Sequence, residues 1–197
     1  MTLLAVPNFS EGRSAETIEA VQEAIKGGPA RLLDIHSDAD HHRTVFTLAG
    51  EPGELAPAVV ALARAATERI DLRAHDGIHP RVGVLDVAPI VYLNEADRGA
   101  ACAEALLEAD MLSEQLNLPV FLYGILARGR TRAEVRRGGP AMLQARIESG
   151  ELTPDFGPRA HDLRTGAVLV AARPPLVAFN VELAVPATLE EAQAIAA

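Results

Sequence analysis

The sequence is poor in cysteine and in aromatic residues. Its one cysteine, Cys102, cannot form an intramolecular disulfide, which fits a reducing compartment. There is no tryptophan, and two tyrosines and five phenylalanines offer few platforms for base stacking. The net charge of −9 also opposes general nucleic-acid binding, whose affinity rests on neutralising phosphates. These scarcities argue against a disulfide-stabilised domain and against a nucleic-acid partner.

Long hydrophobic runs are missing as well. No apolar run approaches the roughly 18 to 20 residues that a membrane span needs, so we expect no membrane partner. Residues 1–10 lack a basic stretch followed by an apolar core, so we expect no signal peptide and a cytoplasmic location. The composition is otherwise ordinary for a globular domain, with 49% hydrophobic and 23% charged residues among 197.

Lysine is almost absent, and arginine takes its place. Lys26 is the one lysine in the sequence. Arginine grips planar carboxylates through paired donors, so an anionic ligand can be accepted locally despite the acidic total. The base composition of the genome can produce the same bias, and the bias alone does not separate the two explanations.

Apolar periodicity alternates between strand and helix patterns along the chain. Strands are expected at 3–9, 31–35, 43–48, 82–93, 119–123, 168–172 and 176–183. Helices are expected from a cap at Ser14 to about 26, from near Pro52 to about 70, from Asn94 and Asp97 to about 116, and after the capping-box pairs Thr131/Glu134 and Thr188/Glu191. The β-α-β-β-α-β order over the first 93 residues predicts an α+β fold, a ferredoxin-like split βαβ sandwich with a mixed β-sheet and helices packed on it.

Three polar clusters stand out, and the first lies where a buried strand runs into a helix, at residues 7–13. The helix start offers free N–H groups, which form a natural anion site. The same pattern is also typical of a helix cap surrounded by solvated charges.

The second cluster spans residues 36–43. In extended form, His36, Asp38, Asp40 and His42 would point one way and could bind Zn²⁺ or a harder metal. Asp and His also crowd surface turns for conformational reasons, and the spacing matches no closed zinc motif, which favours a plain hairpin turn. A metal-dependent enzyme that uses this cluster together with other histidines is kept as an alternative.

The third cluster contains His75 and His79, which are four residues apart. On a helix this spacing would suggest paired metal ligands. Gly77 between them and Pro80 after them favour a loop, because the residue before proline is pushed out of the α region. A loop that feeds a buried strand often presents catalytic groups, and a histidine there can act as acid or base.

Several segments together resemble the glutamate formiminotransferase family, in order and rough spacing. The segments are 6–13, 32–34, 43–45, 79–87, 119–124, 154–158, 165–167 and 178–180. The strongest are Pro-Asn-Phe-Ser-Glu-Gly at 7–12 and His-Pro-Arg-Val-Gly-Val-Leu-Asp at 79–86. The resemblance covers essentially the whole chain.

The resemblance implies a transferase that moves a formimino (or formyl) group between glutamate and tetrahydrofolate, its co-substrate, in histidine breakdown. It implies two ferredoxin-like subdomains with folate between them, and no metal. Residues 1–177 look like the N-terminal subdomain, and 178–197 like the opening strand and helix of a truncated second one. A homo-oligomer or a partner is then expected to complete the cleft, and a non-catalytic folate-binding or partner-binding relative is the alternative.

The resemblance also implies roles for particular residues. His79 matches the position of the general acid and base. The segment Gly157, Pro158, Arg159, Ala160, His161, Asp162, Leu163, Arg164, Thr165 and Gly166 matches the folate-contacting segment, although a long surface connection has the same composition. Further residues expected to line the cleft are Asn8, Ser10, Glu11, Arg43 and Arg81. One departure is His36, which stands where better-known members have a second acidic residue; Asp38 or Asp40 can replace that acid, or the substrate differs.

Overall fold

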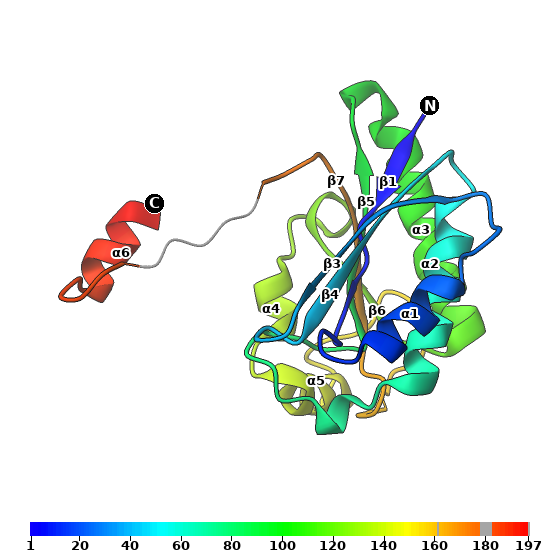
Figure 1. Cartoon of the computed structure of the whole chain (residues 1–197). Helices are drawn as coiled ribbons and strands as arrows, with labels where there is room; N and C mark the ends of the chain where they lie inside the picture. Colours follow the sequence, from blue (N-terminus) through cyan, green and yellow to red (C-terminus); the bar gives the residue numbers. More distant parts are fainter. Residues whose placement is uncertain (161, 178–182, 197) are drawn as a thin grey trace.

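A mixed β-sheet organises the part of the chain that the structure describes, residues 1–160, 162–177 and 183–196 of a computed structural model (Figure 1). Within these residues the seven strands are β1 (Leu3–Ala5), β2 (Asn8–Phe9), β3 (Arg31–Asp38), β4 (Arg43–Gly50), β5 (Leu85–Tyr92), β6 (Val120–Leu122) and β7 (Val168–Arg173). The helices are α1 (Ala15–Glu23), α2 (Leu55–Arg69), α3 (Arg98–Leu116), α4 (Arg132–Arg136), α5 (Gly139–Glu148) and α6 (Leu189–Ala196). Short 3-10 segments are η1 (Leu72–Ala74), η2 (Glu95–Asp97) and η3 (Gly124–Ala127).

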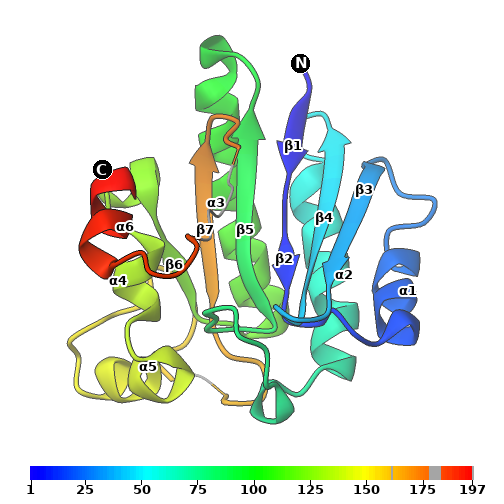
Figure 2. The same ribbon diagram turned by 60° about the vertical axis from the view of Figure 1, so that its left-hand side comes forward.

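The strands lie in the order β3, β4, β1 with β2, β5, β7 and β6 (Figure 2). β1 and β2 form one interrupted strand, since both pair antiparallel with β4 on one side and with β5 on the other. Together with α1 and α2, these strands have the order of a ferredoxin-like split βαβ unit. β7 and β6 extend the sheet by parallel pairing beside β5. The predicted α+β fold with a mixed sheet is confirmed.

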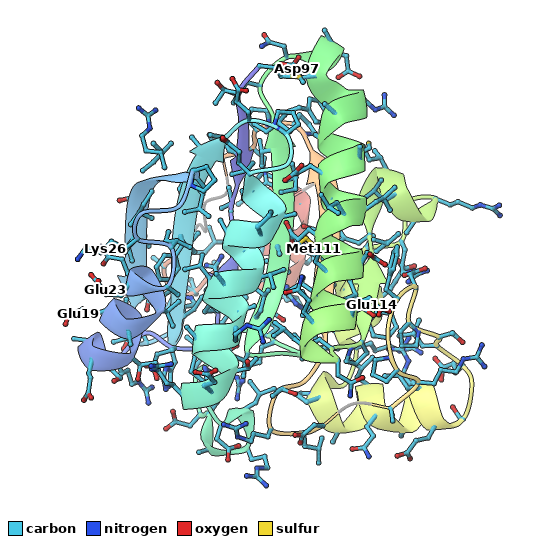
Figure 3. The ribbon with its side chains drawn as sticks, turned by 90° about the vertical axis from the view of Figure 1, so that its right-hand side faces the viewer. Glu19, Glu23, Lys26, Asp97, Met111 and Glu114 are labelled. Atoms are coloured by element: carbon cyan, nitrogen blue, oxygen red, sulfur yellow. The ribbon has the colours of Figure 1, made fainter. Side chains whose placement is uncertain are left out.

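The helices divide between the two faces of the sheet. α1, α2 and α3 cover one face, and α4 and α5 lie on the other, beside β6 and β7 (Figures 1 and 2). The outer surface of α1, α2 and α3 carries charged residues. Glu23 and Lys26 form an ion pair at 3.0 Å, and Glu114 lies on the exposed side of α3 (Figure 3). None of the helices in the described ranges is long and apolar enough to cross a membrane.

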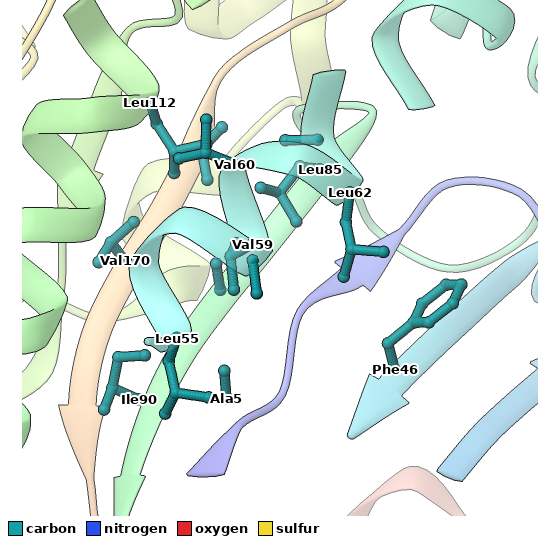
Figure 4. Close-up of a cluster of buried hydrophobic side chains, with 14 of the residues drawn as sticks. Ala5, Phe46, Leu55, Val59, Val60, Leu62, Leu85, Ile90, Leu112 and Val170 are labelled. Atoms are coloured by element: carbon teal, nitrogen blue, oxygen red, sulfur yellow. The ribbon is translucent and has the colours of Figure 1, made fainter. Parts of the chain in front are cut away.

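Two hydrophobic cores result. The larger lies between the sheet and α1 to α3, with Val59 of α2, Leu112 of α3 and Ile90 of β5 near its centre (Figure 4). A second core lies under α4 and α5. Successive side chains of β7 point to opposite faces of the sheet, so the strand contributes to both cores: Val170 packs in the larger core and Leu169 in the smaller one. α4 and α5 do not reach over the β3–β4 side, so the sheet keeps a partly open face there.

Predicted and observed boundaries differ where tertiary contacts decide them. The strand expected at 82–93 begins at Leu85, because the Val82 N–H instead donates to a carboxylate of the following strand. α5 was not predicted, since Gly138, Gly139 and Pro140 at its start are typical of a turn. Of the strand expected at 176–183, residues 176–177 are not in the sheet and 178–182 lie outside the described residues. The capping boxes at Thr131/Glu134 and Thr188/Glu191 are confirmed.

Two glutamates are buried on the inner side of α3. Glu104 caps the start of α2: its carboxylate accepts hydrogen bonds from the backbone N–H groups of Gly53, Leu55 and Ala56 at 2.5, 3.1 and 2.8 Å. α2 has no side-chain cap of its own, so a neighbouring helix supplies it. Glu108, one turn later, is fully buried, and neither carboxyl oxygen has a hydrogen-bond partner among the described residues.

Glu108 is expected to destabilise the fold at neutral pH. Burial, and then the charge of Glu104, raise the pKa of Glu108 well above its ordinary value. A carboxyl whose pKa is raised on folding binds more protons in the folded state, so stability falls as pH rises from about 4.3 towards the raised value. Glu108→Leu removes this loss and should raise the free energy of unfolding at pH 7 by about 1–3 kcal/mol.

Urea unfolding at several pH values measures this effect. The gain should shrink as pH falls towards about 4.5, where the wild-type carboxyl is protonated. Glu114→Leu, at an exposed position of the same helix, is the matched control and should leave the pH dependence unchanged. A Glu108→Leu variant whose stability follows pH just as the wild type does would contradict the prediction.

Candidate active site

The loop between η1 and β5 presents His79 at the open face of the sheet. Arg81 holds this loop, since its guanidinium donates to the carbonyl oxygens of His75 at 2.5 Å, Gly77 at 2.7 Å and His79 at 3.3 Å. Gly77 is needed because a Cβ there would lie 2.5 Å from the His41 carbonyl oxygen. The loop therefore packs against the β3–β4 turn, and the predicted loop conformation of this cluster is confirmed.

His75 supports the loop from inside. Its Nδ1 accepts from the Gly77 N–H at 3.1 Å, so its Nε2 carries the proton and donates to the His42 carbonyl oxygen at 2.8 Å. The ring stacks on His42 with 4.2 Å between centroids, and burial lowers the pKa of His75. His42 in turn accepts from the Gly12 N–H at 3.0 Å. These hydrogen bonds occupy both histidines in joining the loop to the start of α1.

Of the five residues predicted to line the cleft, Asn8, Ser10, Arg43 and Arg81 line a small pocket together with His79. Asn8, Ser10, Glu11 and Arg81 also form hydrogen bonds that hold the frame of the site. Asn8 and Ser10 are almost fully buried; Ser10 Oγ donates to the Gly83 carbonyl oxygen at 2.7 Å, and Asn8 Oδ1 accepts from Arg43 Nε at 2.9 Å. Glu11 accepts from backbone N–H groups at the start of α1, and its carboxylate lies 3.4 Å from His42. Arg81, the fourth, is directed at the loop's own carbonyls. Arg43 alone of the five lines the hollow described next.

A hollow of about 590 Å³ lies over the open sheet face. It is lined by His36, Asp38, His41, Arg43, Val45, Ile78, His79, Pro80, Arg132 and Arg136. The last two project from α4 at positions i and i+4, which share one face of a helix. Strand β4, the His79 loop and α4 thus bring three arginines and a partly buried histidine together.

Asp86 of β5 fixes the position of α4 relative to the loop. Its carboxylate is 3% exposed, accepts from the Val82 N–H at 2.8 Å and forms an ion pair with Arg136. A buried carboxylate needs such partners, since an unpaired one is strongly disfavoured. The loop end, the sheet and α4 are therefore joined at one charged group.

The environment keeps His79 neutral. Burial, and then the positive charges of Arg43 and Arg136, lower the pKa of His79 to about 4. His41 and Arg132 act in the same direction. At neutral pH the imidazole of His79 is therefore unprotonated and able to accept a proton.

Comparison with known proteins places this arrangement in a family. Residues 2–173 match the model of the formiminotransferase domain, N-terminal subdomain. The chain belongs to the formiminotransferase family. The resemblance seen in the sequence is thereby confirmed.

Relatives of two kinds are similar to the chain. Formimidoyltransferase-cyclodeaminase of Rattus norvegicus is 39% identical over 197 residues, covering 97% of this chain and 36% of that protein. Glutamate formimidoyltransferase of Streptococcus pyogenes serotype M1 is 36% identical over 182 residues, covering 90% of this chain and 61% of the relative. The corresponding protein of Thermoplasma acidophilum is 33% identical, with 90% and 60% covered. The chain thus spans less than two thirds of the length of these relatives.

The segment that resembles the family's folate contact lies apart from the lining of the hollow. The Leu72 N–H donates to the Arg164 carbonyl oxygen at 2.9 Å, and the Val84 N–H to that of Thr165 at 2.8 Å. Gly166 packs so closely on Val82 that a Cβ would lie 2.1 Å from its carbonyl oxygen. His161 lies outside the described residues. The C-terminal half of the segment therefore packs on the ends of the His79 loop, and its folate contact stays a prediction.

The four-residue metal arrangement at 36–42, which was kept as an alternative, is not formed. β3 ends at Asp38, and Asp40 and His42 belong to the following turn, so the side chains do not continue on one side. Asp38 accepts from the Asp40 and His41 backbone and contacts the His41 ring. In the described ranges, no group of three or more His, Cys, Asp or Glu side chains is arranged to hold a metal ion. The hairpin-turn interpretation of this cluster is confirmed.

Removing the charge of Asp86 should destabilise the site and the fold together. Asp86→Asn leaves Arg136 without its buried partner, which costs about 3–5 kcal/mol of unfolding free energy. Urea unfolding measures the loss. The control is Asp76→Asn, which breaks an ion pair with Arg13 whose side chains are 73% and 45% exposed and should change stability by about 1 kcal/mol or less. Equal losses in the two variants would refute the role of Asp86.

Proposed function

We propose that this chain carries the proton-transfer half of a formiminotransferase site, in which His79 acts as general base and then general acid. The reaction moves a formimino group between a glutamate nitrogen and N5 of tetrahydrofolate; a formyl group is the variant. The observation that supports it is a neutral, partly buried His79 at the edge of a hollow rich in arginine. The streptococcal relative is a glutamate formimidoyltransferase by name, which agrees with this reaction class.

The chemistry needs one group that both accepts and returns a proton. The incoming nitrogen attacks the amidine carbon, a C–N bond forms, and a tetrahedral species results. His79 accepts the proton that the attacking nitrogen loses and returns it to the departing nitrogen as the second C–N bond breaks. The proton count balances, so neither a metal nor a redox partner is required for this step.

The lowered pKa of His79 keeps the imidazole in the neutral form that can accept a proton, although it also makes the ring a weaker base. A neutral imidazole is available in nearly every molecule at pH 7, whereas an unshifted histidine would be partly protonated. Holding two substrates side by side would contribute much of the remaining rate.

Tetrahydrofolate is the co-substrate in this proposal, and residues 157–166 are its proposed contact. Arg159 and Leu163 of this segment are exposed, which leaves a cationic and an apolar side chain available to an anionic tail and a pterin ring. The segment is joined to the end of the His79 loop through the Gly83–Gly166 bridge. The contact and the catalytic loop are therefore mechanically connected.

A transfer assay tests the proposal directly. The chain should transfer the formimino group from N-formiminoglutamate to tetrahydrofolate, and His79→Ala should lower the rate by about 10²- to 10⁴-fold, the usual contribution of a general acid or base. Thermal unfolding of the variant checks that its fold is kept. Unchanged turnover in His79→Ala would disprove the assigned role. Absence of transfer in the wild type would favour a non-catalytic, ligand-binding relative.

The protonation of His79 gives a second test, independent of turnover. NMR titration of the histidine rings, with His79→Gln to assign the signal, should place the His79 transition near pH 4. Because the folded pKa lies below the unfolded value of about 6.5, the wild type should also lose stability relative to His79→Gln as pH falls from about 6.5 to 4. A His79 transition near pH 6.5 would contradict the electrostatic account of the site.

A further inference from the structure

The hollow beside His79 carries an excess of positive charge. Arg43, Arg132 and Arg136 line it, against one carboxylate in the lining, Asp38. Asp38 is already occupied by the His41 ring and by two backbone N–H groups of its turn. The whole chain has a net charge of −9, so this local excess opposes the overall balance.

The partners of the three guanidinium groups differ. Arg136 forms the buried ion pair with Asp86. Arg43 is held by the neutral amide oxygen of Asn8, and Arg132 lies over the Tyr123 ring with 5.8 Å to its centroid. Among the described residues, neither Arg43 nor Arg132 has a carboxylate within ion-pair distance. Two oriented guanidinium groups are thus available to an outside anion.

Holding these charges together is unfavourable without such an anion. Burial, and then the like charges of Arg136 and Arg132, lower the pKa of Arg43, and the charges of Asp86 and Asp38 offset only part of this shift. The Asn8 amide fixes the Arg43 fork in place, and α4 fixes the other two arginines one turn apart. Forked donors in fixed positions match planar carboxylates through paired hydrogen bonds, which a mobile surface arginine does not achieve.

We propose that Arg43 and Arg132, with Arg136 held beside them by Asp86, form a carboxylate-binding subsite that holds the dicarboxylate end of the substrate beside His79. This proposal rests on the proposed function in one respect: in that reaction the formimino group is bonded to the nitrogen of glutamate, which is a dicarboxylate. Arg132 is the specificity-determining residue, because it is exposed and bears no structural ion pair. The ligand class is a five-carbon dicarboxylate, presented either by the free amino acid or by the glutamate tail of folate.

The subsite also couples binding to the proton chemistry. An anion seated among these arginines offsets the charges that disfavour protonation of His79. The groups that face His79 are Arg43 from β4, His41 from the β3–β4 turn and Arg132 with Arg136 from α4. A bound dicarboxylate should therefore move the titration of His79 to higher pH, which favours return of the proton to the leaving nitrogen.

Glutarate is the probe for the test, because it has both carboxylates and no group to transfer. Calorimetric titration of the full chain at low salt should show saturable binding of glutarate and much weaker binding of butyrate. Arg132→Gln should raise the dissociation constant by about tenfold to a hundredfold, the usual effect of losing a charge-assisted pair. Arg132→Lys keeps the positive charge but loses the paired N–H donors of the guanidinium group, so its dissociation constant should lie between those of the wild type and Arg132→Gln.

The matched control is Arg64→Gln, which removes the same charge from α2 on the opposite side of the sheet, where Arg64 contacts Gln115 at 3.2 Å. Glutarate should also raise the pH of the His79 NMR transition in the wild type and in Arg64→Gln, but not in Arg132→Gln. Equal affinities in all variants, no saturable binding, or an Arg64→Gln effect as large as that of Arg132→Gln would overturn the subsite.

Two further titrations identify the source of the carboxylates. Titration with N-formiminoglutamate measures the affinity for the amino-acid substrate. Tetrahydropteroate lacks the glutamate tail, so comparing its affinity with that of tetrahydrofolate measures the contribution of the tail. If Arg132→Gln weakens the binding of only one of these ligands, N-formiminoglutamate or tetrahydrofolate, the result supports the subsite and identifies the ligand that occupies it. Because none of these measurements needs turnover, a chain that binds glutarate through Arg132 but fails to transfer keeps the subsite and loses the proposed function.

Discussion

The buried carboxylate of Asp86 is the interaction on which the site depends. Charge in a protein interior persists only when it is paired and hydrogen-bonded, and Asp86 meets that requirement with groups from two other segments. Val82 ends the His79 loop, and Arg136 ends α4. Positioning Arg136 also positions Arg132, one turn earlier on the same helix face. The His79 loop and the cationic wall of the hollow are therefore joined through one buried carboxylate.

Much of the framework was predictable because its determinants are local. Capping residues such as Ser14 and Thr131 mark helix starts from a few neighbouring positions. The alternation of apolar residues located the strands well enough to predict a ferredoxin-like order. Gly77 and Pro80 similarly predicted a loop around His79. Features that depend on residues no more than four or five positions apart, such as helix caps and this loop, were therefore predicted correctly from the sequence.

What the sequence did not predict depends on distant partners. The start of α2 was predicted near Pro52, but its cap is Glu104 of another helix, nearly fifty residues later, and the local sequence could not indicate that partner. Arg132 and Arg136 were passed over as site residues, although their spacing on a capped helix was a usable signal. Asn8 was predicted to line the cleft, and it does line a pocket beside His79. Its hydrogen bond with Arg43, by contrast, depends on a tertiary contact that the sequence does not indicate.

The position of β7 has a consequence for synthesis of the chain on the ribosome. β7 follows β6 by more than forty residues, yet it lies between β5 and β6 and supplies the hydrogen bonds of each. A nascent chain that has emerged only through α5 can complete the antiparallel ferredoxin-like part but leaves β6 unpaired. Until residues 168–173 leave the exit tunnel, the exposed backbone of β5 and β6 offers pairing sites to other chains.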